Sequence, residues 1–137
     1  MSLTLTRTVS FHALHRLYRP EWSADENRRA FGPLSEEPPH GHEYRCAVTV
    51  SGSEGPRDLL VDLAQLDTIL HEEIVAPHDG RYLNREVPAF ARTLPTCEAM
   101  AAHFFARLAA RLPVGVRLER VRVSEDPTLH ADCTGPA

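Results

Sequence analysis

The 137-residue chain contains no lysine, and its fifteen basic residues are all arginines. A lysine Schiff base and a lysine general base are therefore excluded. Cysteine is also scarce: Cys46, Cys97 and Cys133 are widely spaced and odd in number, so they form neither a Cys-x-x-Cys pair nor a disulfide framework. The question of a metal site therefore turns on histidine, of which the chain has eight.

Long apolar runs and basic patches are missing as well. The longest apolar runs fall well short of the roughly 20 residues that a membrane helix needs. The segment 1–8 alternates like a strand and lacks the apolar centre of a signal peptide. The formal net charge is −4 and the pI is about 6.0, with no basic stripe that would favour nucleic acid or an anionic membrane. We therefore expect a cytoplasmic protein that binds neither partner.

The overall composition is that of a globular protein. Hydrophobic residues make up 42% and charged residues 25%, close to the globular average, which excludes disordered and collagen-like classes. The length fits one domain that buries about two-thirds of its chain surface. We predict a single domain over 1–137.

Apolar alternation predicts two strands before any helix. The first ends near His15, with Phe11 and His15 on one face and His12 on the other. Prolines and glycine interrupt 19–39, which predicts a long irregular excursion of the kind that is often functional. The second strand ends at a turn over 51–56 and places these residues on one face: His42, Tyr44, Cys46, Val48 and Val50.

Two helices and two further strands follow. An apolar stripe beginning at Leu63 predicts a helix with Asp62 as its N-cap, and Thr96 is a candidate cap for a second helix. A loop is expected over 76–94. A third strand over 116–125 shifts its apolar phase after Leu118, which indicates a bulge, and 127–133 is a candidate edge strand. The order ββααββ predicts an α+β fold: a four-stranded antiparallel sheet with two helices on one face.

The sharpest local feature is His40-Gly41-His42. Two residues apart on an extended chain, both imidazoles face the same way. His15, at the end of the preceding strand, is the natural third ligand of a three-histidine site with an open fourth position, the catalytic form of zinc coordination. An exposed polar pair beside a loop is the alternative interpretation.

Six segments in order resemble the 6-pyruvoyltetrahydropterin synthase family, which includes 6-carboxytetrahydropterin synthase. The two most specific are Phe11-His12-Ala13-Leu14-His15-Arg16-Leu17, similar to Phe-x-Ala-x-His-x-Leu, and His40-Gly41-His42-Glu43-Tyr44, similar to His-Gly-His-x-Tyr. The others are Leu60-Val61-Asp62-Leu63, the stretch Asp79 to Asn84, Pro95-Thr96-Cys97-Glu98, and Val123-Ser124-Glu125. Together they span nearly the whole chain.

The resemblance implies a tunnelling fold with Zn²⁺ held by His15, His40 and His42. It also implies a homohexamer made of two stacked trimers, with a pterin pocket between subunits. Glu125 would bind the guanidine-like edge of the pterin through two parallel hydrogen bonds.

The same resemblance places Thr96 and Glu98 near the pterin pocket. Each has a structural alternative. Thr96 also fits a plain helix cap, and Glu98 also fits a solvated first-turn glutamate favoured by the helix dipole.

The chain departs from the family at its usual catalytic cysteine. The family has this cysteine before His-Gly-His, where Leu34 or Glu36 stands here, and no cysteine precedes Cys46. Glu37 instead fits the Glu-x-x-His-Gly-His pattern of a family variant that serves folate synthesis. A carboxylate can act as a base when burial or its neighbours raise its pKa. A merely charged loop is the alternative.

A second departure lies in the family's Asp-His pair. Gly80 follows Asp79, and the nearest histidine, His78, precedes it. His78 with Asp79 is the candidate for shuttling a second proton, and His71 is another candidate for the missing histidine.

The resulting functional hypothesis is a zinc-dependent pterin side-chain lyase. It would cleave 7,8-dihydroneopterin triphosphate by a retro-aldol step to 6-hydroxymethyl-7,8-dihydropterin. One alternative is 6-carboxytetrahydropterin synthesis for deazapurines, against which the missing cysteine and the altered pair count. Another is a paralogue with altered chemistry, or with only a zinc- or pterin-binding role.

Overall fold

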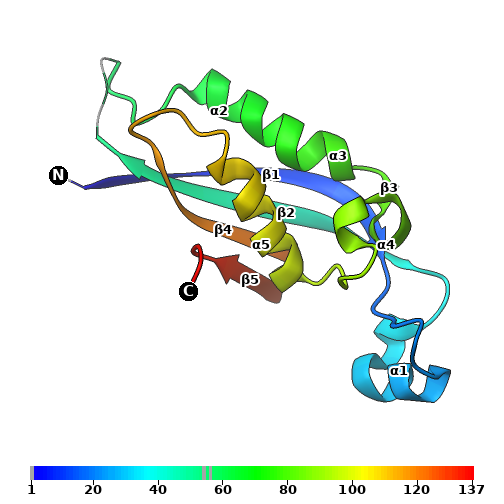
Figure 1. The fold of residues 1–137 in the computed structure, drawn as a ribbon. Helices are drawn as coiled ribbons and strands as arrows, with labels where there is room; N and C mark the ends of the chain where they lie inside the picture. The colour runs from blue at the N-terminus through cyan, green and yellow to red at the C-terminus, as the bar shows by residue number, and fades with distance from the viewer. Residues whose placement is uncertain (1, 54, 56) are drawn as a thin grey trace.

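A computed structural model describes residues 2–53, 55 and 57–137. Its sheet is built on two long antiparallel strands, β1 (Leu3–His15) and β2 (His40–Gly52), followed outward by β4 (Arg117–Asp126) and β5 (Leu129–Cys133) (Figure 1). The four predicted strands are confirmed. The prediction of a purely antiparallel four-stranded sheet is wrong in one respect, because a two-residue strand, β3 (Arg81–Tyr82), pairs with β1 in parallel.

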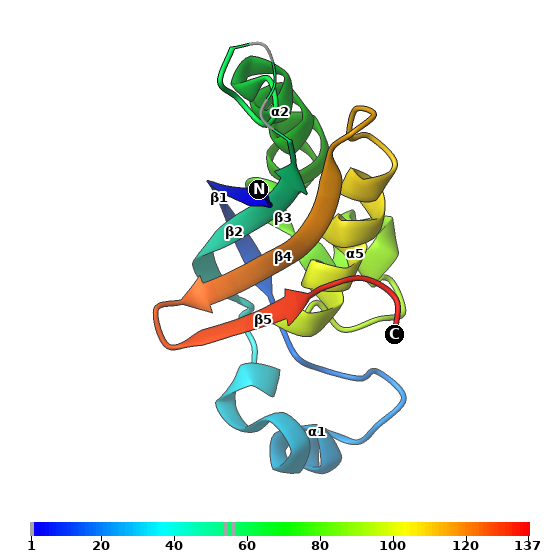
Figure 2. The same ribbon diagram turned by 90° about the vertical axis from the view of Figure 1, so that its left-hand side faces the viewer.

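Two helical rods cover one face of this sheet, as predicted (Figures 1 and 2). The first consists of α2 (Leu63–Leu70), a π-helical turn over His71–Val75, and α3 (Ala76–His78). The second is α5 (Cys97–Ala109). Both predicted N-caps are confirmed, since Asp62 and Thr96 each accept a hydrogen bond from the backbone N–H three residues later at 3.1 Å.

The core lies between the sheet and the two rods. Every second residue of β2 from Tyr44 to Val50 is fully buried, which confirms the predicted inward face. Burying such a side chain contributes roughly 1.5–3 kcal/mol. The largest buried partners from β1 and the helices are Phe11, Leu66, Leu70, Ile74, Met100, Phe104 and Leu108.

The excursion between β1 and β2 is more regular than predicted. It contains α1 (Ala24–Phe31) and a 3₁₀ turn over Gly32–Ser35. Ser23 caps α1 by accepting from the Glu26 N–H at 3.1 Å, and the Glu26 carboxylate accepts from the Ser23 hydroxyl at 3.3 Å. The prolines flank this helix rather than interrupt it, so they are compatible with eight helical residues.

The predicted loop over 76–94 is also partly regular. It includes α3, β3, α4 (Leu83–Glu86) and a 3₁₀ turn over Pro88–Phe90. Among the described residues, no helix has the length and apolar character needed to cross a lipid bilayer.

The bulge predicted after Leu118 is confirmed. Thr49 pairs with Arg120 and Val50 with Leu118, so Glu119 is an extra residue on β4. The predicted turn over 51–56 is only partly described, because β2 continues to Gly52 and residues 54 and 56 lie outside the described part.

Candidate metal centre and its surroundings

Three imidazoles converge where β1 ends and β2 begins. The β1–β2 register places His15 directly opposite His40 and Ala13 opposite His42. Because side chains two apart on a strand share a face, all three rings lie on the core side. Their ligand nitrogens lie within 4.8 Å of one another. The predicted grouping of these three histidines is therefore confirmed, and the register of β1 and β2 produces it.

The chemistry of the three rings fits a metal ion. The Nε2 atoms of His15, His40 and His42 are all buried without a hydrogen-bond partner among the described residues. His15 donates its Nδ1 hydrogen to the Pro95 carbonyl at 2.8 Å, which leaves the Nε2 lone pair free. Burial lowers the pKa of His15 to about 4 and also lowers that of His40, so both rings are neutral ligands at pH 7. Three neutral imidazoles with an open position are typical of catalytic zinc.

Glu125, near the end of β4, brings a carboxylate to this cluster. Its Oε2 lies 3.1 Å from His42 Nε2, and its side chain is only 11% exposed. Its Oε1 accepts a hydrogen bond from the Cys97 thiol at 3.5 Å. Burial is the main reason that the pKa of Cys97 is raised to about 12, so the thiol remains a donor at neutral pH. Sequence reasoning missed this role of Cys97, since nothing local marks a thiol that faces a distant strand.

A hollow of about 530 Å³ opens beside His42 and Glu125. Its wall is formed by the start of β2 and the turn that joins β4 to β5. Behind the cluster, Tyr44 packs its ring edge-to-face against His15 and His42, with centroid distances of 5.7 and 5.4 Å. The Tyr44 hydroxyl is buried without a partner among the described residues, and burial raises its pKa. The site therefore has a buried, aromatic back and an open front.

Comparison with known proteins agrees with this geometry. Residues 4–136 match the model of the family described as 6-pyruvoyl tetrahydropterin synthase. The chain belongs to the 6-pyruvoyl tetrahydropterin synthase family. It is 38% identical to human 6-pyruvoyl tetrahydrobiopterin synthase over 122 residues. The aligned region covers 88% of this chain and 83% of the human protein. An Archaeoglobus fulgidus protein, provisionally named a 6-carboxy-5,6,7,8-tetrahydropterin synthase, is 31% identical over 87 residues, covering 64% and 68%.

The fold is that of the family as well. The solved structure of Caenorhabditis elegans 6-pyruvoyl tetrahydropterin synthase superimposes with a TM-score of 0.92 at 29% identity, covering 99% of this chain and 97% of that one. The α+β tunnelling fold expected from the sequence is thereby confirmed.

The family motif that contains Thr96 lies beside the cluster. Thr96 caps α5 with its hydroxyl oxygen, immediately after the Pro95 carbonyl that holds His15. Glu98 is exposed in the first turn of α5. Both structural alternatives weighed for these residues are thus realised, and a role toward substrate stays a prediction.

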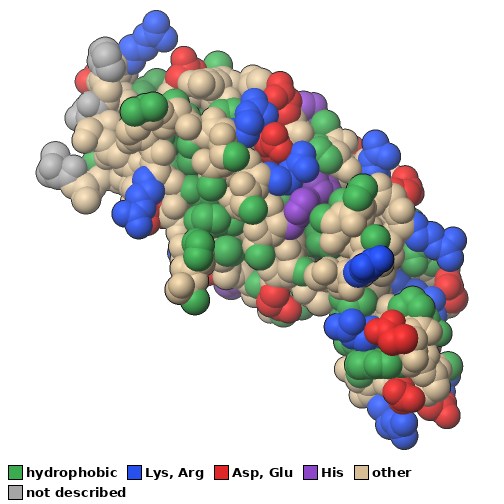
Figure 3. Space-filling view, viewed as in Figure 1, with side chains coloured by type: hydrophobic (Ala, Val, Ile, Leu, Met, Phe, Trp, Pro, Cys, Tyr) green, Lys and Arg blue, Asp and Glu red, His purple; other side chains and the backbone are tan. Residues whose placement is uncertain are grey.

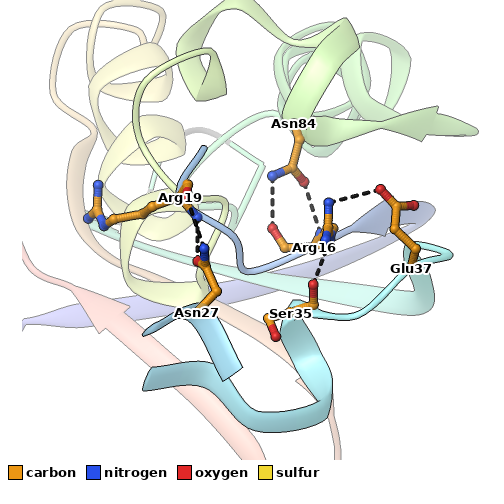
Figure 4. Close-up of polar contacts among 6 residues, drawn as sticks. All are labelled: Arg16, Arg19, Asn27, Ser35, Glu37 and Asn84. Carbon is orange, nitrogen blue, oxygen red and sulfur yellow. Dashed lines mark hydrogen bonds and ion pairs between the residues drawn. The ribbon is translucent and has the colours of Figure 1, made fainter. Parts of the chain in front are cut away.

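Close to the family's cysteine position, which Leu34 or Glu36 occupies here, Glu37 forms an ion pair with Arg16. The Glu37 carboxylate accepts a hydrogen bond from Arg16 Nη1 at 2.8 Å, and its side chain is 63% exposed (Figure 4). Arg16 directly follows the predicted ligand His15, and Glu37 precedes His40 by three residues. The candidate base therefore lies in the long segment that connects the two ligand-bearing strands, close to the start of β2, with its carboxylate directed to Arg16.

The two candidates for the family's Asp-His pair, His78 and Asp79, lie in different environments. His78 is fully buried and donates its Nδ1 hydrogen to the Ile74 carbonyl at 2.6 Å. It contacts Phe11, which in turn stacks on Tyr44, so within one chain these rings separate it from the three imidazoles. Asp79 is exposed and accepts from the His12 backbone N–H at 2.9 Å.

The other candidate for the missing histidine, His71, is exposed in the π-helical turn. Neither His71 nor His78 therefore lies beside the three imidazoles of its own chain.

Proposed function

We propose that this protein is a zinc-dependent lyase that shortens the side chain of 7,8-dihydroneopterin triphosphate, giving 6-hydroxymethyl-7,8-dihydropterin. One observation carries the proposal. Three imidazole nitrogens without hydrogen bonds to any described residue converge next to the Glu125 carboxylate, and Glu125 lines a hollow on the surface. The three imidazoles can bind a Lewis-acidic metal ion, and the Glu125 carboxylate beside them can accept hydrogen bonds from the N–H groups of a pterin ring.

The metal ligands in this proposal are His15, His40 and His42. Zn²⁺ bound there supplies a Lewis acid that lowers the pKa of a substrate hydroxyl. The Pro95 carbonyl keeps His15 in the tautomer that presents Nε2.

Glu125 fixes the ring of the substrate. Its two oxygens accept parallel hydrogen bonds from the amino and ring N–H groups of the pterin. The Cys97 thiol restrains one of these oxygens before substrate arrives. We assign Thr96 and Glu98, at the start of the same helix, to contacts with the ring. This orientation directs the reacting side-chain carbons toward the three imidazoles.

Glu37 is the proposed base. It accepts the proton of the C2′ hydroxyl, the C1′–C2′ bond breaks, and the electron pair passes into the pterin ring system. C1′ then gains a proton, and the two-carbon fragment leaves as glycolaldehyde triphosphate. We assign the second proton transfer to Asp79 and not to His78, because His78 is fully buried in the core. Because Asp79 is exposed outside the cluster of its own chain, that role requires a neighbouring copy.

A homohexamer, made of two trimers, is part of the proposal. β5 is an edge strand, and β1 is covered on its outer side only over Ala13 and Leu14 by β3. Unpaired strand edges of this kind favour pairing with another copy.

A second reaction deserves a direct test because of the human relative. That protein is a 6-pyruvoyl tetrahydrobiopterin synthase, and it shares 38% of its residues with this chain over the aligned region. The same substrate would then lose triphosphate and keep its carbon chain. The A. fulgidus relative points to 6-carboxytetrahydropterin as a third product.

The deciding experiment is a product assay. Zinc-loaded protein is incubated with 7,8-dihydroneopterin triphosphate, and the pterins are separated by chromatography with mass detection. We expect 6-hydroxymethyl-7,8-dihydropterin from the wild type, and a loss of at least about 100-fold in rate for Glu37→Gln, which is the lower range for removing a general base.

Glu36→Gln is the matched control, since it changes the adjacent exposed carboxylate and should retain full rate. A 6-pyruvoyl or 6-carboxy product would replace the retro-aldol assignment. Unchanged substrate would leave a metal- or pterin-binding role, and equal rates for the two variants would remove Glu37 as the base.

A further inference from the structure

A cavity of about 580 Å³ lies where the segment after β1 meets residues 82–94. It is separate from the hollow beside Glu125 and shares no lining residue with it. Figure 3 shows arginine side chains gathered where the α1 excursion joins the rest of the molecule. The charged lining of the cavity consists of four cations and one carboxylate: Arg16, Arg19, Arg85, Arg92 and Glu21.

Two of the four arginines have no ion-pair partner among the described residues, and a third is only loosely paired. Arg19 and Glu21 are 3.8 Å apart at their nearest charged atoms, which is the loose end of ion pairing. Arg85 and Arg92 are exposed and make no ion pair with another described residue. Arg16 is balanced by Glu37 outside the lining. Cations gathered in a concave wall attract an anion more strongly than the same charges on a flat surface.

Two of the arginines are held in place before any ligand arrives. Asn84 hydrogen-bonds to both the N–H and the carbonyl of Arg16, and Asn27 does the same for Arg19, at 2.7–2.9 Å (Figure 4). The Arg16 guanidinium also lies 3.8 Å above the centre of the Tyr18 ring. Fixing the wall in advance reduces the entropy lost on binding.

The cavity adjoins the metal cluster at two points of the chain. Arg16 directly follows His15, and Leu94, another lining residue, precedes the Pro95 carbonyl that holds the His15 ring. An anion in the cavity is thus next to the end of β1 that carries the metal ligand.

We propose that this arginine cavity binds a polyphosphate chain, and that its natural occupant is the triphosphate of the pterin substrate. A guanidinium group can donate two parallel hydrogen bonds to the oxygens of one phosphate, and it stays charged at all relevant pH values. The substrate assignment rests on the proposed function, whereas polyphosphate binding itself does not.

The first test is calorimetric titration of the full chain, as purified, with the magnesium salt of tripolyphosphate, with metal content measured before and after. The test variant is Arg85→Gln combined with Arg92→Gln. We expect it to bind at least tenfold more weakly, since one lost charge-assisted hydrogen bond is worth about that factor. Arg117→Gln is the control, because Arg117 is 82% exposed at the far end of β4. Equal affinity in all three proteins, or no binding to the wild type, overturns the proposal.

The second test distinguishes the triphosphate of the pterin substrate from free polyphosphate as the occupant of the cavity. With 7,8-dihydroneopterin triphosphate, the double variant should raise KM about tenfold and leave kcat within about twofold, and with unphosphorylated 7,8-dihydroneopterin it should match the wild type. If tripolyphosphate binding falls but KM does not change, the cavity binds free polyphosphate and the substrate assignment is wrong. If the wild type binds tripolyphosphate through these arginines but turns over no pterin, the proposed function fails and the polyphosphate site stands.

Discussion

Asn84 holds the backbone of Arg16 from both sides. Its Oδ1 accepts the Arg16 N–H at 2.9 Å, and its Nδ2 donates to the Arg16 carbonyl at 2.8 Å (Figure 4). An amide that pairs with both groups of one residue replaces the strand partner that β1 loses after His15. The chain can therefore leave the sheet without unsatisfied polar groups, while the imidazole just before it stays fixed.

Replacing Asn84 with alanine should destabilise the protein by about 2 kcal/mol. Two net hydrogen bonds of roughly 1 kcal/mol each are lost, and the half-buried backbone groups of Arg16 are left without partners. Urea unfolding followed by circular dichroism measures the change. Asn84→Asp keeps the acceptor and loses the donor, so its free energy of unfolding should lie between those of the wild type and Asn84→Ala. A change below about 0.5 kcal/mol in the alanine variant would contradict the role given to these two hydrogen bonds.

His42→Ala should abolish zinc binding. The variant removes one of three ligands, and the five histidines outside the cluster do not join it in the described structure. Metal analysis after dialysis at neutral pH checks this. His130→Ala, which removes an exposed histidine of β5, should retain the metal content of the wild type. A full equivalent of zinc in the His42 variant would refute the three-histidine assignment.

His78 should make the fold less stable in mild acid. Desolvation is the main reason that its pKa falls from 6.5 to about 4; the Ile74 carbonyl opposes this shift, and His103, Arg107 and Arg81 add to it. As the pH falls from 6.5 towards 4, the unfolded chain binds a proton at this residue that the folded chain excludes. The free energy of unfolding then drops by on the order of 3 kcal/mol from this group alone.

Comparing the wild type with His78→Gln isolates that contribution, since the other histidines titrate in both proteins. Unfolding free energies at pH 7 and pH 4.5 should differ clearly less in the variant. Parallel pH dependences in the two proteins would show that His78 is protonated without cost in the fold.

The chain should sediment at about six times its mass of 15.3 kDa. The reason is the exposed outer edges of β1 and β5, which need strand partners. Sedimentation velocity from 1 to 50 μM checks the size and its concentration dependence. A monomer throughout that range would exclude both the hexamer and any catalytic role for Asp79 that depends on a neighbouring copy.

The sequence predicted the grouping of the three histidines well because its determinants are mostly local. His40 and His42 are two apart on one strand, and His15 ends the strand before it, so alternation alone puts the rings on one face. The caps Asp62 and Thr96 were predictable for the same reason. α1 was not predicted, although Ser23 and Glu26 have capping-box spacing, because prolines on both sides of a segment favour irregular structure.

The remaining differences arise from contacts between distant segments. Nothing near Cys97 in the sequence indicates that its thiol meets Glu125, 28 residues later. His78 was expected beside the reaction because of its neighbour Asp79, but the end of the first helical rod turns it into the core. β3 exists because Gly80, with a φ of 73°, lets the chain turn back onto the carbonyl of His12.

The pairing of His15 with His40 across β1 and β2 has a consequence for how the protein is assembled and monitored. A slip of one residue in this pairing would bring His15 opposite Gly41 and turn both imidazoles of β2 to the other face. Under the proposed zinc binding, metal content would therefore report on correct strand alignment. The 24 residues between the strands do not set this register, so changes of length there that leave Arg16, Arg19 and Glu37 in place should preserve the grouping of the three histidines.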